Sequence, residues 1–172
     1  MEPVHDVGGR TVADRNDVVT MPELLLMRHA QAEPAAIDGE DFGRPLTAAG
    51  RTAAAQAARR IAALLAASGA KVECLLVSPA RRTAETAAIV ARELALAATT
   101  LQEVPELYLA TPQAIRTAIE RFRAGAQTIL VIGHNPSLSE FGGELSRRYA
   151  NGHLPTAGVW HVTLAIDRAA AP

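Results

Sequence analysis

The sequence predicts an α/β fold in three layers, in which a mainly parallel central sheet carries helices on both of its faces. Three short apolar runs have the length and composition of buried strands, and turn or capping residues bound each of them. These runs cover residues 24–27, 72–77 and 128–132. A segment with helical features follows each run, and strands that alternate with helices in this way are typical of parallel sheets.

Two weaker strands are expected at residues 99–104 and 159–166. The length of 172 residues fits a single domain with a core of its own. Residues 1–20 are polar, rich in Asp and Arg, and without helical or strand periodicity, so we expect a flexible N-terminal extension there. The folded domain is expected over residues 21–172.

Helix starts are marked by residues that cap helix N-termini, in three cases followed by a proline, which favours the first helical position. We interpret four residues as these N-caps: Thr47, Ser78, Thr111 and Asn135. The helices are expected over residues 48–67, 80–96 and 112–122 and from residue 136 onward. The second of them should bury five small or apolar side chains: Ala84, Ala87, Ala88, Ala91 and Leu94.

Residues 33–45 contain two prolines and two glycines, which predicts a loop directly after the first strand. Its charged side chains are expected near any site that the strand end forms: Asp38, Glu40, Asp41 and Arg44. The sequence supports two alternative roles for Arg44 equally well. The guanidinium orients a substrate at the mouth of the site, or it pairs with a carboxylate of its own loop, that of Glu40 or Asp41.

Composition excludes several classes of partner. The chain has 17 basic and 18 acidic side chains and a net charge of −1, so nothing in its overall charge favours nucleic acid or a membrane surface. No apolar run approaches the roughly 18 residues of a membrane span, and the N-terminus lacks the features of a signal peptide. We therefore expect a cytoplasmic protein. The single cysteine, Cys74, is expected to pack as a small apolar residue.

Polar residues follow each of the three clear strands. Arg28 and His29 follow the first, residues 78–82 the second, and His134 the third. The carboxyl ends of parallel strands meet at one edge of a sheet, so these side chains are expected to converge although they are far apart in sequence. His153 and His161 lie outside this pattern and are expected to be hydrogen-bonded structural residues.

The converging residue types suit chemistry at a phosphoryl group. Guanidinium groups such as those of Arg28 and Arg82 bind anionic phosphoryl oxygens through paired, charge-assisted hydrogen bonds. A neutral imidazole can attack phosphorus to form a phosphohistidine, and a second imidazole can donate hydrogen bonds to the phosphoryl oxygens. His29 and His134 can fill these two roles. The helix expected after His134 adds backbone N–H donors at its N-terminus.

Four motifs together resemble the histidine phosphatase superfamily, which includes phosphoglycerate mutases and many phosphatases. They are LMRHA at 26–30, RPLT at 44–47 with Gly50, SPARRTAET at 78–86 and VIGHNP at 131–136. The resemblance spans residues 24–166, and the short form with RPLT is most similar to the SixA-type phosphohistidine phosphatases. It implies a phosphoglycerate mutase-like fold. Ala30 stands where a glycine commonly follows the nucleophile.

The resemblance also implies the roles of the site residues. His29 is the residue that becomes phosphorylated, Arg28 and Arg82 bind the phosphoryl group, and His134 completes the pocket. Neither a metal nor another cofactor is implied. Larger relatives use a carboxylate from a mid-chain insertion as proton donor, for which this chain has little room, and Glu106 is our candidate for that acid.

We expect a cofactor-independent phosphatase whose partner is a phosphorylated protein or a small phosphorylated metabolite. Phosphohistidine on a protein is the preferred substrate, since its labile phosphoramidate bond needs a general acid less than an ester does. A small-molecule phosphomonoesterase is the alternative within the same superfamily. The alternative from another class is a non-catalytic phosphate-binding module, although such a module has no need for a neutral nucleophile.

Overall fold

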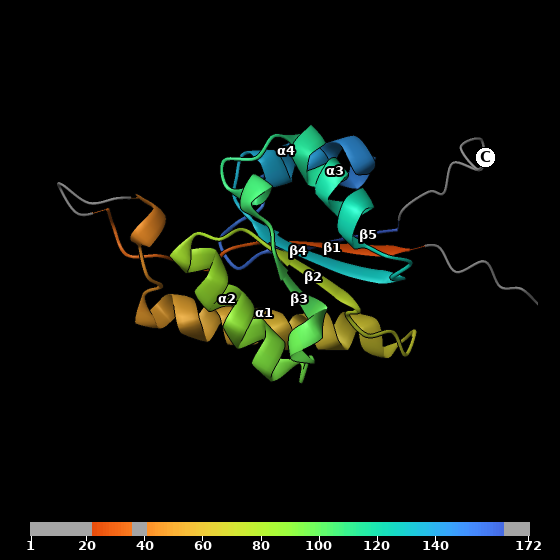
Figure 1. The fold of residues 1–172 in the computed structure, drawn as a ribbon, viewed down its shortest axis with the longest axis horizontal. Coiled ribbons are helices and arrows are strands. Elements are labelled where there is room, and N and C mark those ends of the chain that lie inside the picture. The colour runs from red at the N-terminus through yellow and green to blue at the C-terminus, as the bar shows by residue number, and fades with distance from the viewer. Residues whose placement is uncertain (1–21, 36–40, 164–172) are drawn as a thin grey trace, which may run out of the picture.

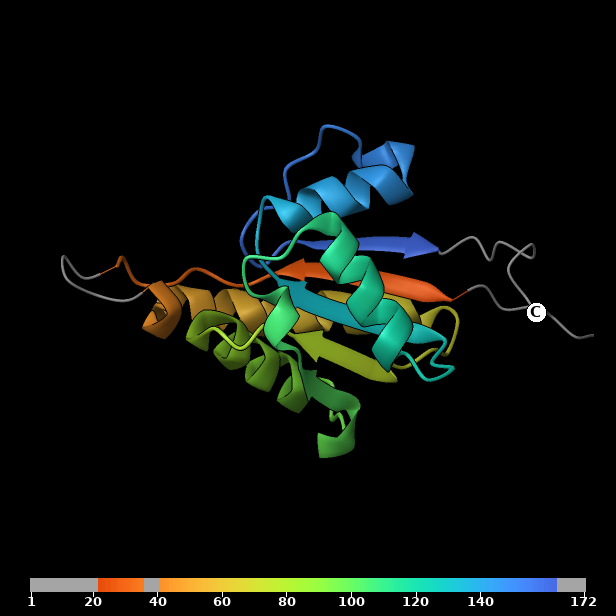
Figure 2. The same cartoon turned by 45° about the horizontal axis from the view of Figure 1, so that its top comes forward.

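A computed structural model describes residues 22–35 and 41–163 of the chain. Five strands form one sheet in the order β3-β2-β4-β1-β5. Four of them run parallel, and β5 is antiparallel to β1, as the opposite arrow directions in Figure 2 show. Their bounds are Glu23–Arg28 for β1, Cys74–Val77 for β2, Leu101–Glu103 for β3, Thr128–Gly133 for β4 and Val159–Thr163 for β5. The mainly parallel sheet is confirmed.

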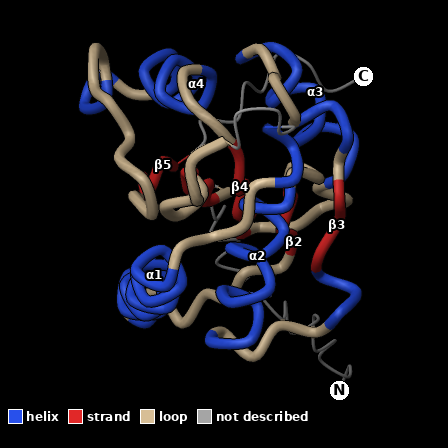
Figure 3. The backbone as a smooth tube through the Cα atoms, turned by 90° about the vertical axis from the view of Figure 1, so that its left-hand side faces the viewer, coloured by secondary structure: helices blue, strands red, loops and turns tan. Residues whose placement is uncertain are grey.

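Helices cover both faces of this sheet and give the three layers that the sequence predicts (Figures 1 and 3). On one face lie α1 (Ala48–Ala66) and α2 (Arg81–Glu93), and on the other lie α3 (Pro112–Phe122) and α4 (Ser137–Leu145). None of the helices in the described part of the chain is long and apolar enough to cross a membrane. The expected extension over residues 1–20 and the end of the last predicted strand lie outside the described residues.

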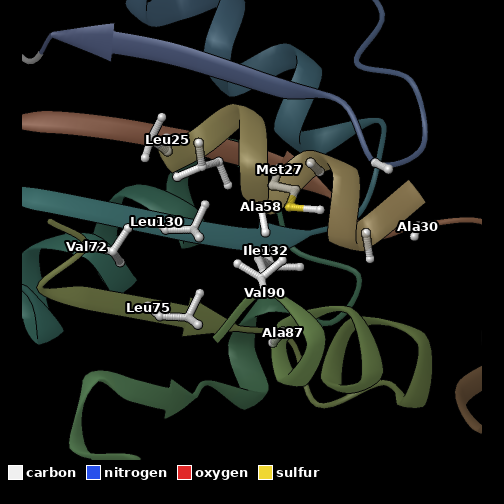
Figure 4. Close-up of a cluster of buried hydrophobic side chains, with 14 of the residues drawn as sticks. Leu25, Met27, Ala30, Ala58, Val72, Leu75, Ala87, Val90, Leu130 and Ile132 are labelled. Carbon is white, nitrogen blue, oxygen red and sulfur yellow. The ribbon is translucent and has the colours of Figure 1, made fainter. Parts of the chain in front are cut away.

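Strand β1 lies between β4 and β5 and is buried on both faces, which explains why its sequence is a continuous apolar run rather than an alternating one. Leu25 and Met27 point into the core shared with α1 and α2, where they meet side chains of β4 and both helices (Figure 4). Leu24 and Leu26 point into the second core, beneath α3 and α4. Cys74 is buried in that second core, as expected of a small apolar residue.

Two of the four predicted caps are confirmed. The hydroxyl of Thr47 accepts from Gly50 N at 2.8 Å, and that of Thr111 accepts from Ala114 N at 3.2 Å. The other two predictions are wrong, because neither Ser78 nor Asn135 caps a helix. Both helices begin later than expected, so the polar side chains just after β2 and β4 are free to make long-range contacts.

The predicted buried face of α2 is confirmed in part. Ala87 is buried, and Ala91 and Leu94 are partly buried against the same core, whereas Ala84 is only half-buried and Ala88 is exposed. The helix ends at Glu93 rather than at residue 96. Its buried residues are Arg82, Thr83, Thr86, Ala87 and Val90. The buried face begins with polar side chains because the N-terminal turns of α2 lie against the carboxyl edge of the sheet. For α4 the prediction is confirmed, since Leu138 and Phe141 are buried and Leu145 packs on the same core.

Two short 3₁₀ helices contribute residues beside the carboxyl edge. The first, η1 (Asp41–Gly43), belongs to the loop between β1 and α1. The second, η3 (Pro105–Leu107), follows β3, and Tyr108 comes directly after it. The rings of Phe42 and Tyr108 meet edge to face with centroids 5.1 Å apart, so the two segments lie together.

Candidate active site

The register of the sheet brings the predicted site residues together. Arg28 pairs with Gly133 across β1 and β4, and the backbone ladder continues one step further, with His29 N donating to Gly133 O at 3.1 Å. On the other side of β4, Ser78 N donates to Ile132 O at 3.1 Å. As a result the rings of His29 and His134 lie with centroids 5.2 Å apart.

The ring of His29 is held in one tautomer. Its Nδ1 lies 2.7 Å from Ala30 O, and because a carbonyl oxygen only accepts, Nδ1 carries the hydrogen. The ring is 8% exposed, and burial lowers its pKa to about 4, helped by the charges of Arg82, Arg28 and Arg44 and opposed by the bond to Ala30. His29 is therefore neutral at pH 7, with the lone pair on Nε2.

His134 is also buried and neutral. Its Nδ1 lies 3.3 Å from Nη2 of Arg82, which can only donate, so Nδ1 accepts and Nε2 carries the hydrogen. Nε2 donates to the hydroxyl of Ser78 at 2.8 Å. Burial lowers the pKa of His134 to about 3, and the nearby charges of Arg82, His29 and Arg28 act in the same direction, against Asp41.

Arg82 reaches the site from the first turn of α2 and is 4% exposed. Its Nη1 donates to Asp41 O at 2.7 Å and its Nη2 to Asp41 Oδ2 at 2.9 Å, so η1 is held against the guanidinium by two bonds. Together with the bond to His134, these contacts fix the plane of the guanidinium. The N-terminus of α2 thereby links the loop before α1 to the histidine pair.

Arg28 approaches from the end of β1. Its Nη1 lies 3.1 Å from Nε2 of His153, which must accept here, and 3.4 Å from Leu154 O. His153 is hydrogen-bonded, as expected, but its partner is a residue of the site. We call Arg28, His29, Arg82 and His134 the site cluster.

Two donors of the site cluster have no partner in the described part of the chain. The Nε atoms of Arg28 and Arg82 are both buried and make no hydrogen bond there. An unsatisfied buried donor on a charged group is costly, and an anion that accepted from both atoms would remove that cost. Both guanidiniums therefore keep hydrogen-bonding capacity that the described residues do not use.

The other two predicted site residues lie differently. Arg44 pairs with Asp41 at 2.8 Å and donates to Glu33 O at 2.9 Å, which matches the predicted pairing within its own loop. The carboxylate of Glu106 accepts from Arg121 of α3 at 3.2 Å, and this side chain is 54% exposed. Among the described contacts Glu106 has none with the site cluster.

Sequence reasoning missed the roles of Ser78 and Tyr108. The ring of Tyr108 meets that of His134 edge to face with centroids 5.7 Å apart, and its hydroxyl donates to Asp41 Oδ2 at 3.3 Å. Ser78 belongs to a predicted motif, but the Ser-Pro pair favoured a capping role. Tyr108 carried no signal, because only pairing between distant segments brings it to the edge of the sheet.

The backbone around His29 is fixed by α2. Ala30 N donates to the hydroxyl of Thr86 at 3.1 Å, and that hydroxyl donates to Arg82 O. In the described residues, no group of three or more His, Cys, Asp or Glu side chains is placed to hold a metal ion.

Comparison with known proteins points to one family. A profile of the histidine phosphatase superfamily (branch 1) matches residues 24–144. No significant match was found among curated proteins.

The fold also matches solved structures. A candidate phosphohistidine phosphatase SixA from Agrobacterium tumefaciens has a TM-score of 0.71 at 24% identity, over 83% of this chain and 92% of the other. One from Nakamurella multipartitia has a TM-score of 0.63 at 29% identity, over 81% and 84%. A candidate alpha-ribazole-5'-P phosphatase from Escherichia coli has a TM-score of 0.54 at 18% identity, over 84% and 96%.

The matched segment runs from β1 into α4 and contains every member of the site cluster. Because the profile covers more than half of the sequence, the chain belongs to branch 1 of the histidine phosphatase superfamily.

Proposed function

We propose that this phosphatase hydrolyses phosphohistidine on a protein through a phospho-His29 intermediate. The observation that carries the proposal is the site cluster itself, which brings the neutral rings of His29 and His134 to 5.2 Å between centroids beside two guanidiniums. Among the described residues the Nε of each guanidinium has no partner. A module that only bound phosphate would need the arginines but not the nucleophile.

In the first half-reaction, Nε2 of His29 attacks the phosphorus atom. A bond forms between Nε2 and phosphorus, the bond from phosphorus to the substrate nitrogen breaks, and its electron pair stays on the leaving imidazole. Nδ1 of His29 keeps its hydrogen on Ala30 O, so the ring is oriented for attack and its developing positive charge is stabilised. Arg28 and Arg82 bind the phosphoryl oxygens.

His134 has a second task in this scheme. In the free protein its Nδ1 accepts from Arg82, so it has no hydrogen to give to a phosphoryl oxygen on that side. A bound phosphoryl group favours the protonated ring, because negative charge raises the pKa of a neighbouring imidazole. His134 then becomes the donor that the sequence predicts.

The charge states at the site support phosphohistidine over a phosphate ester. An ester needs an acid that protonates the departing alkoxide, whereas the imidazole of a phosphohistidine leaves as a neutral group once its distal nitrogen is protonated. Glu106, the sequence-derived candidate for such an acid, is paired with Arg121 outside the site cluster. The site therefore favours a leaving group that brings its own proton.

A groove beside the site supports a substrate larger than a metabolite. Its volume is about 840 Å³, and it lies between α4 and residues 150–153. Asn135 and His153 line the groove at the end nearest the site cluster, where His153 also contacts Arg28. A protein that carries the phosphohistidine has room there for residues flanking the modified side chain.

Turnover of a phosphohistidine-bearing protein beside that of an aryl phosphate tests the proposal. Wild type should prefer the phosphohistidine, and His29→Ala should be inactive on both substrates. His161→Asn is the matched control, because His161 lies on β5 and contacts Glu23 rather than the site cluster. Mass analysis of acid-labile phosphate on the quenched enzyme should place it on His29.

The other outcomes identify the alternatives. A preference for the aryl phosphate would indicate a small-molecule phosphomonoesterase. Binding of phosphate without turnover of either substrate would indicate a phosphate-binding module.

A further inference from the structure

One carboxylate contacts the site cluster in the described part of the chain, and it is that of Asp41. Its Oδ2 accepts from Nη2 of Arg82 at 2.9 Å and from the hydroxyl of Tyr108 at 3.3 Å. Its Oδ1 accepts from Arg44 at 2.9 Å. Since the same Nη2 of Arg82 also donates to His134, a single nitrogen separates Asp41 from the histidine pair.

The guanidinium of Arg82 joins Asp41 to the site cluster. Asp41 occupies one edge of the planar group, through Nη1 and Nη2, whereas the buried Nε is unpartnered among the described residues. The contacts of Asp41 therefore leave Nε of Arg82 without a partner among the described residues. The carboxylate reaches the site through the guanidinium that the proposed function assigns to the phosphoryl group.

The surroundings of Asp41 favour its ionised form. Burial tends to raise the pKa of this carboxyl group, but the charges and hydrogen bonds of Arg82 and Arg44 prevail and lower it. The carboxylate faces two cations and the Tyr108 hydroxyl, and no acidic partner contacts it in the described residues. It is thus ionised at neutral pH, when it has no proton to donate but can accept one.

We propose that Asp41 is the general base of the second half-reaction, in which it holds the water that attacks phospho-His29. The water oxygen bonds to phosphorus, the bond from phosphorus to Nε2 of His29 breaks, and the electron pair returns to Nε2. One proton of the water passes to the Asp41 carboxylate and then to solvent. The products are inorganic phosphate and the free enzyme.

This inference rests on the proposed function and narrows its substrate class. Because Asp41 enters the cycle ionised, it supplies no proton to the leaving group in the first half-reaction. Substrates with a phosphorus-to-nitrogen bond, whose leaving group is already protonated, satisfy that condition. Arg44 and Tyr108 hold the carboxylate in place and are positioning residues.

Single-turnover quench experiments with phosphoramidate as donor separate the two half-reactions. The proteins are wild type, Asp41→Asn, Glu106→Gln and the control Glu33→Gln, which alters an exposed carboxylate of the same loop. Asp41→Asn keeps an oxygen that can accept from Arg82. It should therefore form phospho-His29 at a rate close to that of wild type and hydrolyse it about 100-fold more slowly.

The conservative variant supplies a readout that a purely structural role would not move. Asp41→Glu keeps a carboxylate and should recover much of the decay rate that Asp41→Asn loses, whereas Asn, which matches Asp in shape, would serve at least as well as Glu if the side chain only positioned Arg82. Both results would support Asp41 as the base.

Three results would overturn the inference. Equal slowing of formation and decay in Asp41→Asn would show that Asp41 only positions Arg82. Slower decay in Glu106→Gln with unchanged decay in Asp41→Asn would assign the base to Glu106. Absence of phospho-His29 in wild type would overturn the proposed function itself, and this inference with it.

Discussion

The two histidines of the site have opposite tautomers, and their hydrogen-bond partners impose the difference. A carbonyl oxygen requires a hydrogen on Nδ1 of His29, whereas the guanidinium of Arg82 requires a lone pair on Nδ1 of His134. Both rings are buried, and burial makes both neutral at physiological pH. The two rings thus differ in which nitrogen carries the lone pair: it is Nε2 in His29 and Nδ1 in His134.

The low pKa of His29 predicts activity at mildly acidic pH. At pH 5.5 a histidine with the ordinary pKa of 6.5 would be only about one tenth neutral, whereas His29, with a pKa of about 4, stays almost entirely neutral. The rate of phosphoenzyme formation from phosphoramidate should therefore fall less than about twofold between pH 7 and pH 5.5. A fall of about tenfold with a midpoint near 6.5 would contradict the low pKa of His29.

Binding of an oxyanion should raise the pKa of His134. The anion brings negative charge beside a ring whose pKa is about 3 in the free protein, and charge of that sign favours the imidazolium. NMR titration of the His134 Cε1 proton should show a higher midpoint in the presence of saturating tungstate. The Cε1 proton of His161, on the far side of β1 from β4, serves as an internal reference.

At the scale of single elements, local sequence signals predicted which helices and strands exist better than they predicted where each one begins and ends. The apolar run of β1 and the Thr-Pro pair at the start of α3 predicted the bounds of these two elements almost as the structure has them. The caps at Ser78 and Asn135 were wrong, because their side chains find long-range partners: His134 in one case and Leu154 O in the other. Local capping rules cannot foresee a partner that is more than 15 residues away.

The glycine at the start of α1 shows how an element supports the site. A Cβ at position 50 would overlap the carbonyl oxygen of Gln31, two residues after His29. Only a glycine lets the first turn of α1 approach the loop that continues from β1. The same oxygen accepts from Thr47 N at 3.0 Å, which ties this loop to the helix start.

Gly50→Ala should therefore destabilise the fold by about 2 kcal/mol or more and lower the activity, because the backbone after His29 must shift. Gly43→Ala is the matched control, since a Cβ there meets nothing within 4 Å, and its effect should stay within about 0.5 kcal/mol. Urea unfolding of both variants measures the difference. Equal stability of the two variants would show that the loop adapts without cost.

At the scale of the whole molecule, the buried histidines couple folding to pH. Their pKa values in the folded state lie below the ordinary value of 6.5, so between pH 6.5 and about 4 the unfolded chain binds protons that the folded chain does not. The stabilisation is complete above pH 6.5 and is lost as the pH falls through this window. The site is thus a source of acid sensitivity for the entire fold.

The free energy of unfolding should fall by about 1.4 kcal/mol per pH unit for each of the two histidines below pH 6.5. Urea unfolding at pH 7, 6 and 5 measures this slope. A double variant, His29→Asn with His134→Asn, should lose most of the slope. An unchanged slope in that variant would assign the acid sensitivity to other groups.

The sequence by itself determined the elements and the residue types at their ends. Apolar runs, caps and the four motifs are local, so they predicted the α/β layers, and they identified Arg28, His29, Arg82 and His134 together with the family. Strand order and register are set by pairing between distant segments, and only the tertiary structure showed which strand ends are neighbours.

The tertiary structure also decided what surrounds the site cluster. It showed that Asp41 is hydrogen-bonded to Arg82, Ser78 to His134 and Glu106 to Arg121. Each of these contacts joins residues at least 15 positions apart, so no local pattern carries them. Charge states depend on burial and on such contacts, which is why the sequence could predict His29 as the nucleophile, whereas the structure was needed to show that its ring is neutral.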